Sequence, residues 1–210
     1  MTPPIDRERL RRPALALAPR LLGAVVVSDV GGVEVAVRLT EVEAYEGADD
    51  PASHAFRGRT PRTAVMFGPP GHLYCYFTYG MHWCANVVCG TDDVAAAVLL
   101  RAGEVVRGAE TAQERRPASR RGSDLARGPA RLASCLGLDA ATNGVDLCDP
   151  GSPVRIERLP GRRRPGVVAG PRVGIAAAAE RPWRFWLPDE PTVSPFKTGG
   201  RKRRSAAPAD

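Results

Sequence analysis

The sequence contains no apolar run that approaches the roughly 20 residues needed to cross a bilayer, and its N-terminus lacks a signal-peptide core. These absences exclude a membrane-spanning helix and predict a cytoplasmic protein. Lysine is also scarce, since only Lys197 and Lys202 occur among the 30 basic residues. The chain is rich in Ala, Val, Gly and Pro, so codon usage could account for part of its arginine content.

Paired cysteine motifs and nucleotide-binding loops are missing as well. The five cysteines are an odd number without a C-x-x-C pair, whereas zinc sites and small secreted disulfide frameworks show tighter or paired spacing. We therefore expect free, buried thiols. Neither a G-x-G-x-x-G unit nor a G-x-x-x-x-G-K-[ST] loop occurs, and the three histidines lack the spacing of a helical metal motif. The sequence predicts no metal and no cofactor.

The composition that is present indicates a loop-rich globular protein with a basic surface. With 210 residues, 22 Gly and 20 Pro, the chain is long enough for one domain with a sizeable core. Its formal net charge of +7 fits either a polyanionic partner such as nucleic acid or a merely soluble surface. Basic stretches occur at Arg115–Arg121, in the Gly161–Pro165 loop and in an RKRR segment near the C-terminus.

Hydrophobic periodicity and turn residues predict helices and strands that do not alternate regularly, which favours an α+β fold. Helices are expected over Pro13–Leu22, Glu104–Arg115 and from Gly128–Pro129 to Leu136. Strands are expected over Ala24–Ser28, from Val33 onwards, and over His72–Tyr79, His82–Cys89, Val94–Arg101, Val173–Ala177 and Trp183–Leu187. Residues 199–210 are predicted to be a disordered basic tail, which leaves 1–198 as one domain.

Two carboxylates continue the apolar face of the strand that begins at Val33. Val35, Val37 and Leu39 alternate along this face, and the same register would carry it on to Glu41 and Glu43. A carboxylate on a buried face is costly unless it is paired or used. Either glutamate could therefore form a salt bridge with an arginine or act as a general base. Spacing alone does not choose between them.

Other polar and aromatic residues of this region also allow two interpretations. Tyr74 and Tyr76 share one strand face, where they could pack in the core or stack against a base. Tyr79 has the opposite parity and adjoins the predicted turn at Gly80–Met81, where a ring can enter a duplex. His54 lies in a polar loop, at the surface or in a site. Two buried polar residues, Asn86 and Arg101, need partners or face a pocket.

Taken together, the motifs resemble those of the 3-methyladenine DNA glycosylase family of the alkyladenine type, in its bacterial form. They cover most of the chain in order. The matching segments are VEAY (Val42–Tyr45), SHA (Ser53–Ala55), RTPR and MF (Arg59–Arg62, Met66–Phe67), GHLYCYFTYGMHWCAN (Gly71–Asn86), VLLRA (Val98–Ala102), GPARLASCLGL (Gly128–Leu138), PRVGI (Pro171–Ile175) and PWRFWL (Pro182–Leu187).

This resemblance implies a role for each matching residue. Glu43 would activate a water molecule against the sugar C1′, and Arg101 would help to hold that water or Glu43. Tyr79 would fill the gap left in the duplex. Asn86 would disfavour the exocyclic amine of ordinary guanine. The pocket for the flipped base would be lined by Tyr45, His54, Met66, Tyr76, Asn86, Val173 and Gly174, and the DNA backbone would be bound by Arg127, Gly128 and Arg131.

The resemblance also implies a fold and a reaction. The fold would be a single compact α+β domain with a curved, mainly antiparallel sheet and surrounding helices. The protein would be a monomeric, cofactor-free hydrolase that releases damaged purines of the 3-methyladenine type from double-stranded DNA and leaves an abasic site. Hypoxanthine and ethenoadenine are further candidate substrates. Alternatives are a lesion-binding or RNA-binding module without chemistry, and a metal-dependent hydrolase. The ranking of lesions is left open.

Overall fold

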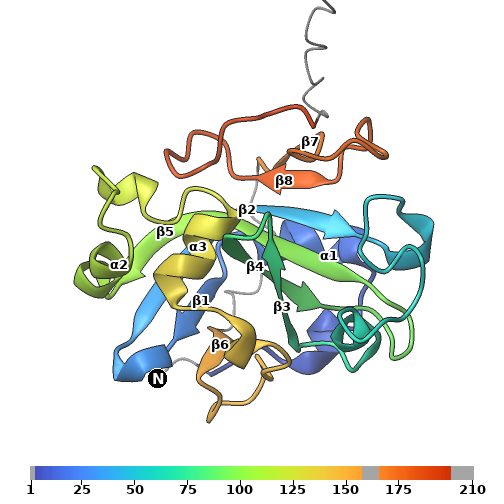
Figure 1. The fold of residues 1–210 in the computed structure, drawn as a ribbon, viewed down its shortest axis with the longest axis horizontal. Helices are drawn as coiled ribbons and strands as arrows, with labels where there is room; N and C mark the ends of the chain where they lie inside the picture. Colours follow the sequence, from blue (N-terminus) through green and yellow to red (C-terminus); the bar gives the residue numbers. More distant parts are fainter. Residues whose placement is uncertain (1–2, 158–165, 200–210) are drawn as a thin grey trace, which may run out of the picture.

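Eight antiparallel strands form one sheet in the computed structural model, which describes residues 3–157 and 166–199 (Figure 1). Six strands follow the order β3-β4-β5-β2-β1-β6, while β8 pairs with both β2 and β7. The strands are β1 (Val25–Ser28), β2 (Val35–Tyr45), β3 (Leu73–Thr78), β4 (His82–Val88), β5 (Ala97–Arg107), β6 (Val154–Glu157), β7 (Val168–Gly170) and β8 (Arg184–Trp186). The α+β prediction is confirmed.

Strand β2 lies at the centre of the sheet and has two different neighbours along one edge. Its first half, Val35–Arg38, pairs with β1, and its second half, Glu41–Glu43, pairs with β8. The other edge pairs with β5 along almost the whole strand. The second half of β2 is therefore enclosed between β5 and β8, and this is the half that carries both glutamates.

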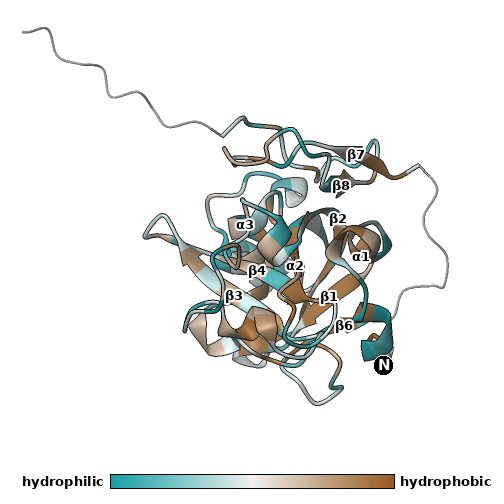
Figure 2. Ribbon diagram, turned by 90° about the vertical axis from the view of Figure 1, so that its right-hand side faces the viewer, coloured by the Kyte–Doolittle hydropathy of each residue, from teal (hydrophilic) through white to brown (hydrophobic). Residues whose placement is uncertain are grey.

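Three α-helices occur in the described ranges, and two of them cover the sheet. They are α1 (Ala14–Leu21), α2 (Ala109–Arg115) and α3 (Pro129–Leu136), and the 3₁₀ helices span Arg7–Leu10, Val30–Gly32, Gly47–Asp49, Ala64–Phe67, Gly122–Asp124 and Ala140–Thr142. Helix α1 packs against β2, while α3 packs against β4 and β5. Their apolar faces join β1, β2 and β6 in the main core, and β1 and β6 are drawn largely in the hydrophobic colour in Figure 2.

Most predicted elements form, but two of them differ from prediction. The predicted helix over Glu104–Arg115 is wrong in its first part, because Glu104–Arg107 extends β5 to pair with the first half of β2, and the helix begins only at Ala109. The predicted strand over Val173–Ala177 does not form. Gly174 has a φ of +74° there and donates its amide to the Lys197 carbonyl, so the chain turns away from the sheet. Strands β6 and β7 were not predicted.

The predicted face of Glu41 and Glu43 is also wrong, because the ladder between β2 and β5 is irregular. Leu39 pairs with Gly103 and Val42 pairs with Leu100, and between them each strand carries an additional residue, Thr40 in β2 and Arg101 in β5. Such a bulge reverses the parity of the following residues. Val42 and Ala44 consequently continue the apolar core, and the two glutamates point to the opposite face.

Two predictions concern segments outside the described residues. The Gly161–Pro165 loop is one, and the tail is the other except for Gly199.

Within residues 3–157 and 166–199, no helix is long and apolar enough to span a membrane.

Candidate active site

A pocket of about 330 Å³ opens on the face of the sheet to which Glu43 points. The loop after β2, the β3–β4 hairpin and the segment after β7 all contribute to its walls. Every residue for which the family resemblance implied a catalytic, base-binding or wedge role lines this pocket: Glu43, Tyr45, His54, Met66, Tyr76, Tyr79, Asn86, Arg101, Val173 and Gly174. The structure thus brings together residues that lie up to 131 positions apart.

The floor of the pocket follows from strand register. Tyr74 lies opposite Asn86, Asn86 opposite Leu99, and Leu99 opposite Glu43, so that one residue comes from each of β3, β4, β5 and β2. Directly paired residues of neighbouring strands project from the same face of a sheet. The row therefore places an aromatic ring, an amide, an aliphatic side chain and a carboxylate side by side.

Glu43 is fully buried, and three donors hold its carboxylate. Its Oε1 accepts the backbone N–H of Val173 at 2.7 Å and lies 3.2 Å from Nη1 of Arg101. Its Oε2 accepts the hydroxyl of Tyr45 at 2.9 Å. An ionised carboxylate oxygen can accept two hydrogen bonds, and among the described residues Oε2 accepts only this one. The group is therefore fixed in place with acceptor capacity left for a further donor such as water.

Glu41 is equally buried but has a different environment. Its Oε1 accepts Nε of Arg101 at 2.9 Å, Nε of Arg184 at 2.6 Å and the hydroxyl of Ser194 at 3.0 Å. Its Oε2 accepts the backbone N–H of Ser194 at 2.7 Å. Glu41 does not line the pocket. The structure thus separates the two carboxylates, with Glu41 in a buried ionic network and Glu43 facing the pocket.

Arg101 lies between the two glutamates and contacts both. It is one of the two bulge residues, and it reaches Glu41 through Nε, Glu43 through Nη1 and the Ser194 hydroxyl through Nη2 at 3.2 Å. Burial alone lowers the pKa of Arg101, but the charges of Glu43 and Glu41 more than offset this, so that the net pKa is raised. Arg101 remains a cation beside the Glu43 carboxylate.

The opposite wall is aromatic. Tyr74 and Tyr76 stack with their ring centroids 5.6 Å apart, and the His54 ring meets Tyr76 edge-on at 4.5 Å. Nδ1 of His54 lies 3.1 Å from the Tyr74 hydroxyl. Desolvation, followed by the charge of Arg62, lowers the pKa of His54, while desolvation raises the pKa of Tyr76 well above its usual value. At neutral pH these rings form an uncharged, electron-rich surface.

Asn86 and Met66 also line the pocket, next to the aromatic rings. Nδ2 of Asn86 donates to the Tyr74 carbonyl at 3.2 Å, which fixes the orientation of the amide. Met66 belongs to a small second core together with Tyr74, and this core supports the wall from behind. Both residues are buried, so each has a packing role besides lining the pocket.

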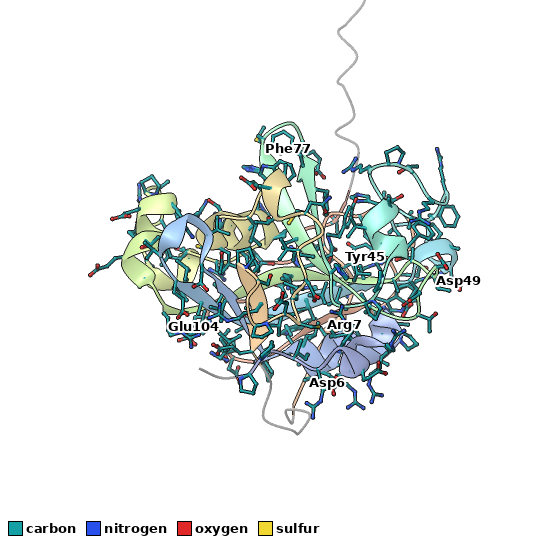
Figure 3. The ribbon with its side chains drawn as sticks, turned by 90° about the horizontal axis from the view of Figure 1, so that it is seen from below. Asp6, Arg7, Tyr45, Asp49, Phe77 and Glu104 are labelled. Atoms are coloured by element: carbon teal, nitrogen blue, oxygen red, sulfur yellow. The ribbon has the colours of Figure 1, made fainter. Side chains whose placement is uncertain are left out.

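Tyr79 lies at the tip of the β3–β4 hairpin, beside the mouth of the pocket. Tyr79 and Gly80 both have positive φ angles, +51° and +67°, and the Met81 N–H bonds to the Thr78 carbonyl, as in a type I′ turn. The side chain of Tyr79 is 83% exposed. The hairpin projects from the body of the molecule, where Phe77 marks it in Figure 3. The turn therefore presents an aromatic ring to solvent.

A second cavity of about 530 Å³ adjoins the pocket. It shares Arg101, Pro129 and Val173 with the first and is also lined by the three residues predicted to bind a DNA backbone, Arg127, Gly128 and Arg131. No side chain caps the N-terminus of α3, and the first residues of the helix, Pro129 to Arg131, line this cavity. The N-terminus of a helix favours an anion.

Sequence analysis missed several buried residues around Glu43. Asp50 and Arg172 form an ion pair, and Arg184 and Ser194 bind Glu41. Their partners lie more than 120 positions away in the sequence, and no local pattern identifies such pairs among many arginines.

The thiols and the acidic side chains show no sign of a metal centre. All five cysteines are free and four are buried, which confirms the prediction, and burial raises the pKa of Cys75, Cys135 and Cys148 to about 11. Within the two described ranges, no three His, Cys, Asp or Glu side chains are grouped so that they could hold a metal ion.

Comparisons with known proteins match nearly the whole chain. A family model described as "Methylpurine-DNA glycosylase (MPG)" matches residues 8–191. A protein of Streptomyces avermitilis is 51% identical over 205 residues, covering 96% of this chain and 95% of that protein. One from Frankia casuarinae is 54% identical over 193 residues, 87% and 88% of the two chains. One from Mycobacterium tuberculosis is 48% identical over 210 residues, 98% of each. All three are named "Putative 3-methyladenine DNA glycosylase".

Proposed function

Because the chain belongs to the methylpurine-DNA glycosylase family, whose members hydrolyse N-glycosyl bonds in DNA, we propose that it removes alkylated purines by means of a water molecule activated by Glu43. The observation that carries this proposal is that Glu43 lines the pocket and that its Oε2 accepts a single hydrogen bond among the described residues, while Oε1 is held by Val173 and Arg101. A water bound at Oε2 would lose its proton to the carboxylate as it attacks C1′. The base then leaves with the bonding electrons.

The damaged base must leave the DNA duplex to reach Glu43. A base stacked in a duplex cannot enter a pocket on the surface of a sheet, so the nucleotide has to rotate out, which costs a few kcal/mol. Tyr79, which is exposed at the hairpin tip, would occupy the vacated position. Arg127, Arg131 and the amides of α3 would hold the adjoining phosphates in the neighbouring cavity. We infer that damaged double-stranded DNA in the bacterial nucleoid is the substrate and that one chain suffices.

The aromatic wall supports a preference for alkylated purines. Alkylation of a ring nitrogen makes the base cationic, and a cation is attracted to the faces of uncharged aromatic rings by about 0.5–2 kcal/mol. Tyr45, Tyr76 and His54 would provide such rings. Hypoxanthine and ethenoadenine are neutral and would gain less. Among the described residues, the pocket lining includes no lysine. We therefore do not expect an imine to the sugar, and the product would be an abasic site.

Base release is the direct test. Duplexes that contain 3-methyladenine, 7-methylguanine, hypoxanthine or ethenoadenine would be incubated with the protein under single-turnover conditions, and the free base would be quantified. We expect release by the wild type and a loss of about a hundredfold or more in Glu43→Gln, because general-base catalysis contributes about that much. Glu104→Gln is the matched control, since Glu104 is half-exposed on β5 and pairs with Arg38 away from the pocket.

Other outcomes would select the alternatives. A wild-type protein that binds lesions but releases no base would be a binding module. Unchanged release by Glu43→Gln would remove Glu43 from the mechanism, and loss of activity with EDTA would indicate a metal-dependent hydrolase. A borohydride-trapped adduct with DNA would contradict the hydrolytic route.

A further inference from the structure

Behind the pocket lies a fully buried ion pair between Arg172 and Asp50. Nη2 of Arg172 donates to Oδ1 of Asp50 at 2.8 Å, and Nη1 donates to Oδ2, so the contact is bidentate. Neither side chain is exposed to solvent. Asp50 follows the 3₁₀ turn Gly47–Asp49 after β2, while Arg172 follows β7. The pair therefore connects two loops from opposite ends of the chain.

A contribution to folding stability does not by itself account for this buried pair. Removing two charges from water costs several kcal/mol per ion, and buried ion pairs are often no more stable than apolar replacements. In addition, Nε of Arg172 is buried and finds no hydrogen-bond partner among the described residues. The cost of this pair, together with its place beside the groups that donate to Glu43, favours a role other than stability alone.

Arg172 is bound on several sides at once. Its Nη1 donates to the Ala44 carbonyl at 3.0 Å, one residue after Glu43. Its guanidinium carbon lies 4.6 Å from the ring centroid of Tyr45 and 5.0 Å from that of Trp183. These contacts fix the guanidinium relative to the end of β2 and hold the Tyr45 ring against it.

Two of the three donors to Glu43 depend directly on this arrangement. The Val173 N–H, which reaches Oε1 at 2.7 Å, follows Arg172 in the chain. The Tyr45 hydroxyl, which reaches Oε2 at 2.9 Å, belongs to the ring packed on Arg172. Asp50 in turn accepts the N–H of Ala52 at its side chain and that of Ser53 at its backbone carbonyl, which orders the loop leading to His54.

We propose that the Arg172–Asp50 pair is a positioning device for the catalytic carboxylate, which aligns the Val173 amide and the Tyr45 hydroxyl on Glu43 and sets the position of the His54 loop. This inference rests on the proposed function. Neither residue lines the pocket, so the pair acts through the groups it holds and not on the substrate. Removing it should slow base release more than it weakens binding of the lesion.

The test compares two variants of the pair with a variant of a buried, ion-paired arginine elsewhere in the sheet. Asp50→Asn combined with Arg172→Gln removes both charges, so that no unpaired buried charge remains. Arg172→Lys keeps the charge but loses the planar bidentate contact. The control is Arg155→Gln, because Arg155 is also buried and pairs with Asp29 and Glu34 from strand β6 at the far edge of the sheet. Single-turnover rates, lesion-duplex affinity and thermal unfolding would be measured for each.

The expected result is a separation of rate from affinity. A misplacement of about 1 Å can cost about a hundredfold in rate. We therefore expect the double variant to lose at least roughly tenfold in base release with less than about a threefold change in affinity, and Arg172→Lys to recover part of the rate. Hydrogen exchange of the Val173 amide should accelerate in both. Arg155→Gln should lower the melting temperature and keep the wild-type rate.

Several results would overturn the inference. A folded double variant with the wild-type rate would do so, as would equal losses in the Arg155→Gln control. If the double variant does not fold, Arg172→Lys decides, and a wild-type rate there contradicts the proposal. A wild type without base release would instead refute the proposed function, and Val173 amide exchange would still report whether the pair holds that amide.

Discussion

At the scale of single residues, His54 links the electrostatics of the pocket to pH. Desolvation and the nearby Arg62 lower the pKa of His54 below its usual 6.5, so the ring is neutral at pH 7 and becomes a cation only as pH falls through this lowered pKa. A cationic ring in the pocket would repel a cationic base. Release of 3-methyladenine should therefore be maintained down to below pH 6.5 and decline under more acidic conditions.

NMR titration of His54 would check this directly. Arg62→Ala removes one of the two causes of the shift, so the titration midpoint of His54 should rise towards 6.5. Arg59→Ala is the control, because Arg59 lies over the Phe67 ring and does not contribute to the shift of His54. A wild-type midpoint at or above 6.5 would contradict the proposed electrostatics of the pocket.

The two glutamates show how far residue identities alone can predict a site. The EAY motif and the family resemblance indicate Glu43, but spacing leaves Glu41 as an equal candidate. The difference lies in partners that are distant in sequence: Arg184 and Ser194 occupy the Glu41 carboxylate, whereas Glu43 borders the pocket. Long-range partners of this kind depend on the final packing of β8 beside β2, which no local pattern encodes.

At the scale of elements, the β3–β4 hairpin should carry much of the binding energy for the lesion. Stacking of an aromatic ring on a base contributes about 1–3 kcal/mol. We expect Tyr79→Ala to weaken binding of a lesion-containing duplex by roughly tenfold to a hundredfold. Thermal stability should change little, because the side chain is 83% exposed.

The matched control for Tyr79 is Val33→Ala. Val33 is also an exposed apolar residue, at 49%, but it precedes β2 at a position that does not line the pocket. Fluorescence anisotropy with a labelled duplex would measure both variants. Wild-type affinity in Tyr79→Ala would exclude a wedge role for this residue.

Helices and strands were predicted best where residues within the element itself, and not distant pairing partners, determine its structure. The hairpin follows from its alternating residues and its turn, and α3 from Pro129 at its start and Gly137 at its end. The bulge was not predicted, because Thr40 and Arg101 look like ordinary strand residues, and the irregularity exists only in the pairing of β2 with β5. The strand predicted over Val173–Ala177 failed for a related reason, since Gly174 bonds to Lys197.

At the scale of the whole molecule, the net charge of +7 predicts salt-dependent binding to DNA. Gly199, the last described residue, lies so near the pocket-lining Ile175 that a Cβ there would be 2.1 Å from its carbonyl oxygen. In the sequence, four basic residues follow at 201–204, beyond the described residues. A chain that stops at Gly199 should show a shallower dependence of log affinity on log salt, by about 0.9 for each lost phosphate contact.

A charge control distinguishes the tail from net charge in general. Arg11→Gln with Arg12→Gln removes cations next to the Arg7–Leu10 turn, and Figure 3 shows Asp6 and Arg7 at the side of the molecule opposite the hairpin. This variant should keep the wild-type salt slope. An unchanged slope in the truncated chain would contradict a contribution of the tail.

The overall architecture could be predicted because ordered motifs span most of the chain and imply the α+β sheet that the structure shows. The charge pairs could not be predicted in the same way. Many arginines compete for each buried carboxylate, and the final packing decides which of them pairs with Glu41 or Asp50. The sequence therefore predicts the residues that line the candidate site better than it predicts the buried residues that hold them in position.

The Glu43 site draws on both ends of the chain, and this has a consequence during protein synthesis. A nascent chain that has already emerged with β2 carries Glu43 and Tyr45, but it lacks Val173 to donate to Glu43 and Ser194 to bind Arg101. The proposed catalytic geometry can therefore form only after Ser194 has left the ribosome. If the proposed function holds, a translation product that ends before Val173 would not create abasic sites, because Glu43 would lack the Val173 donor.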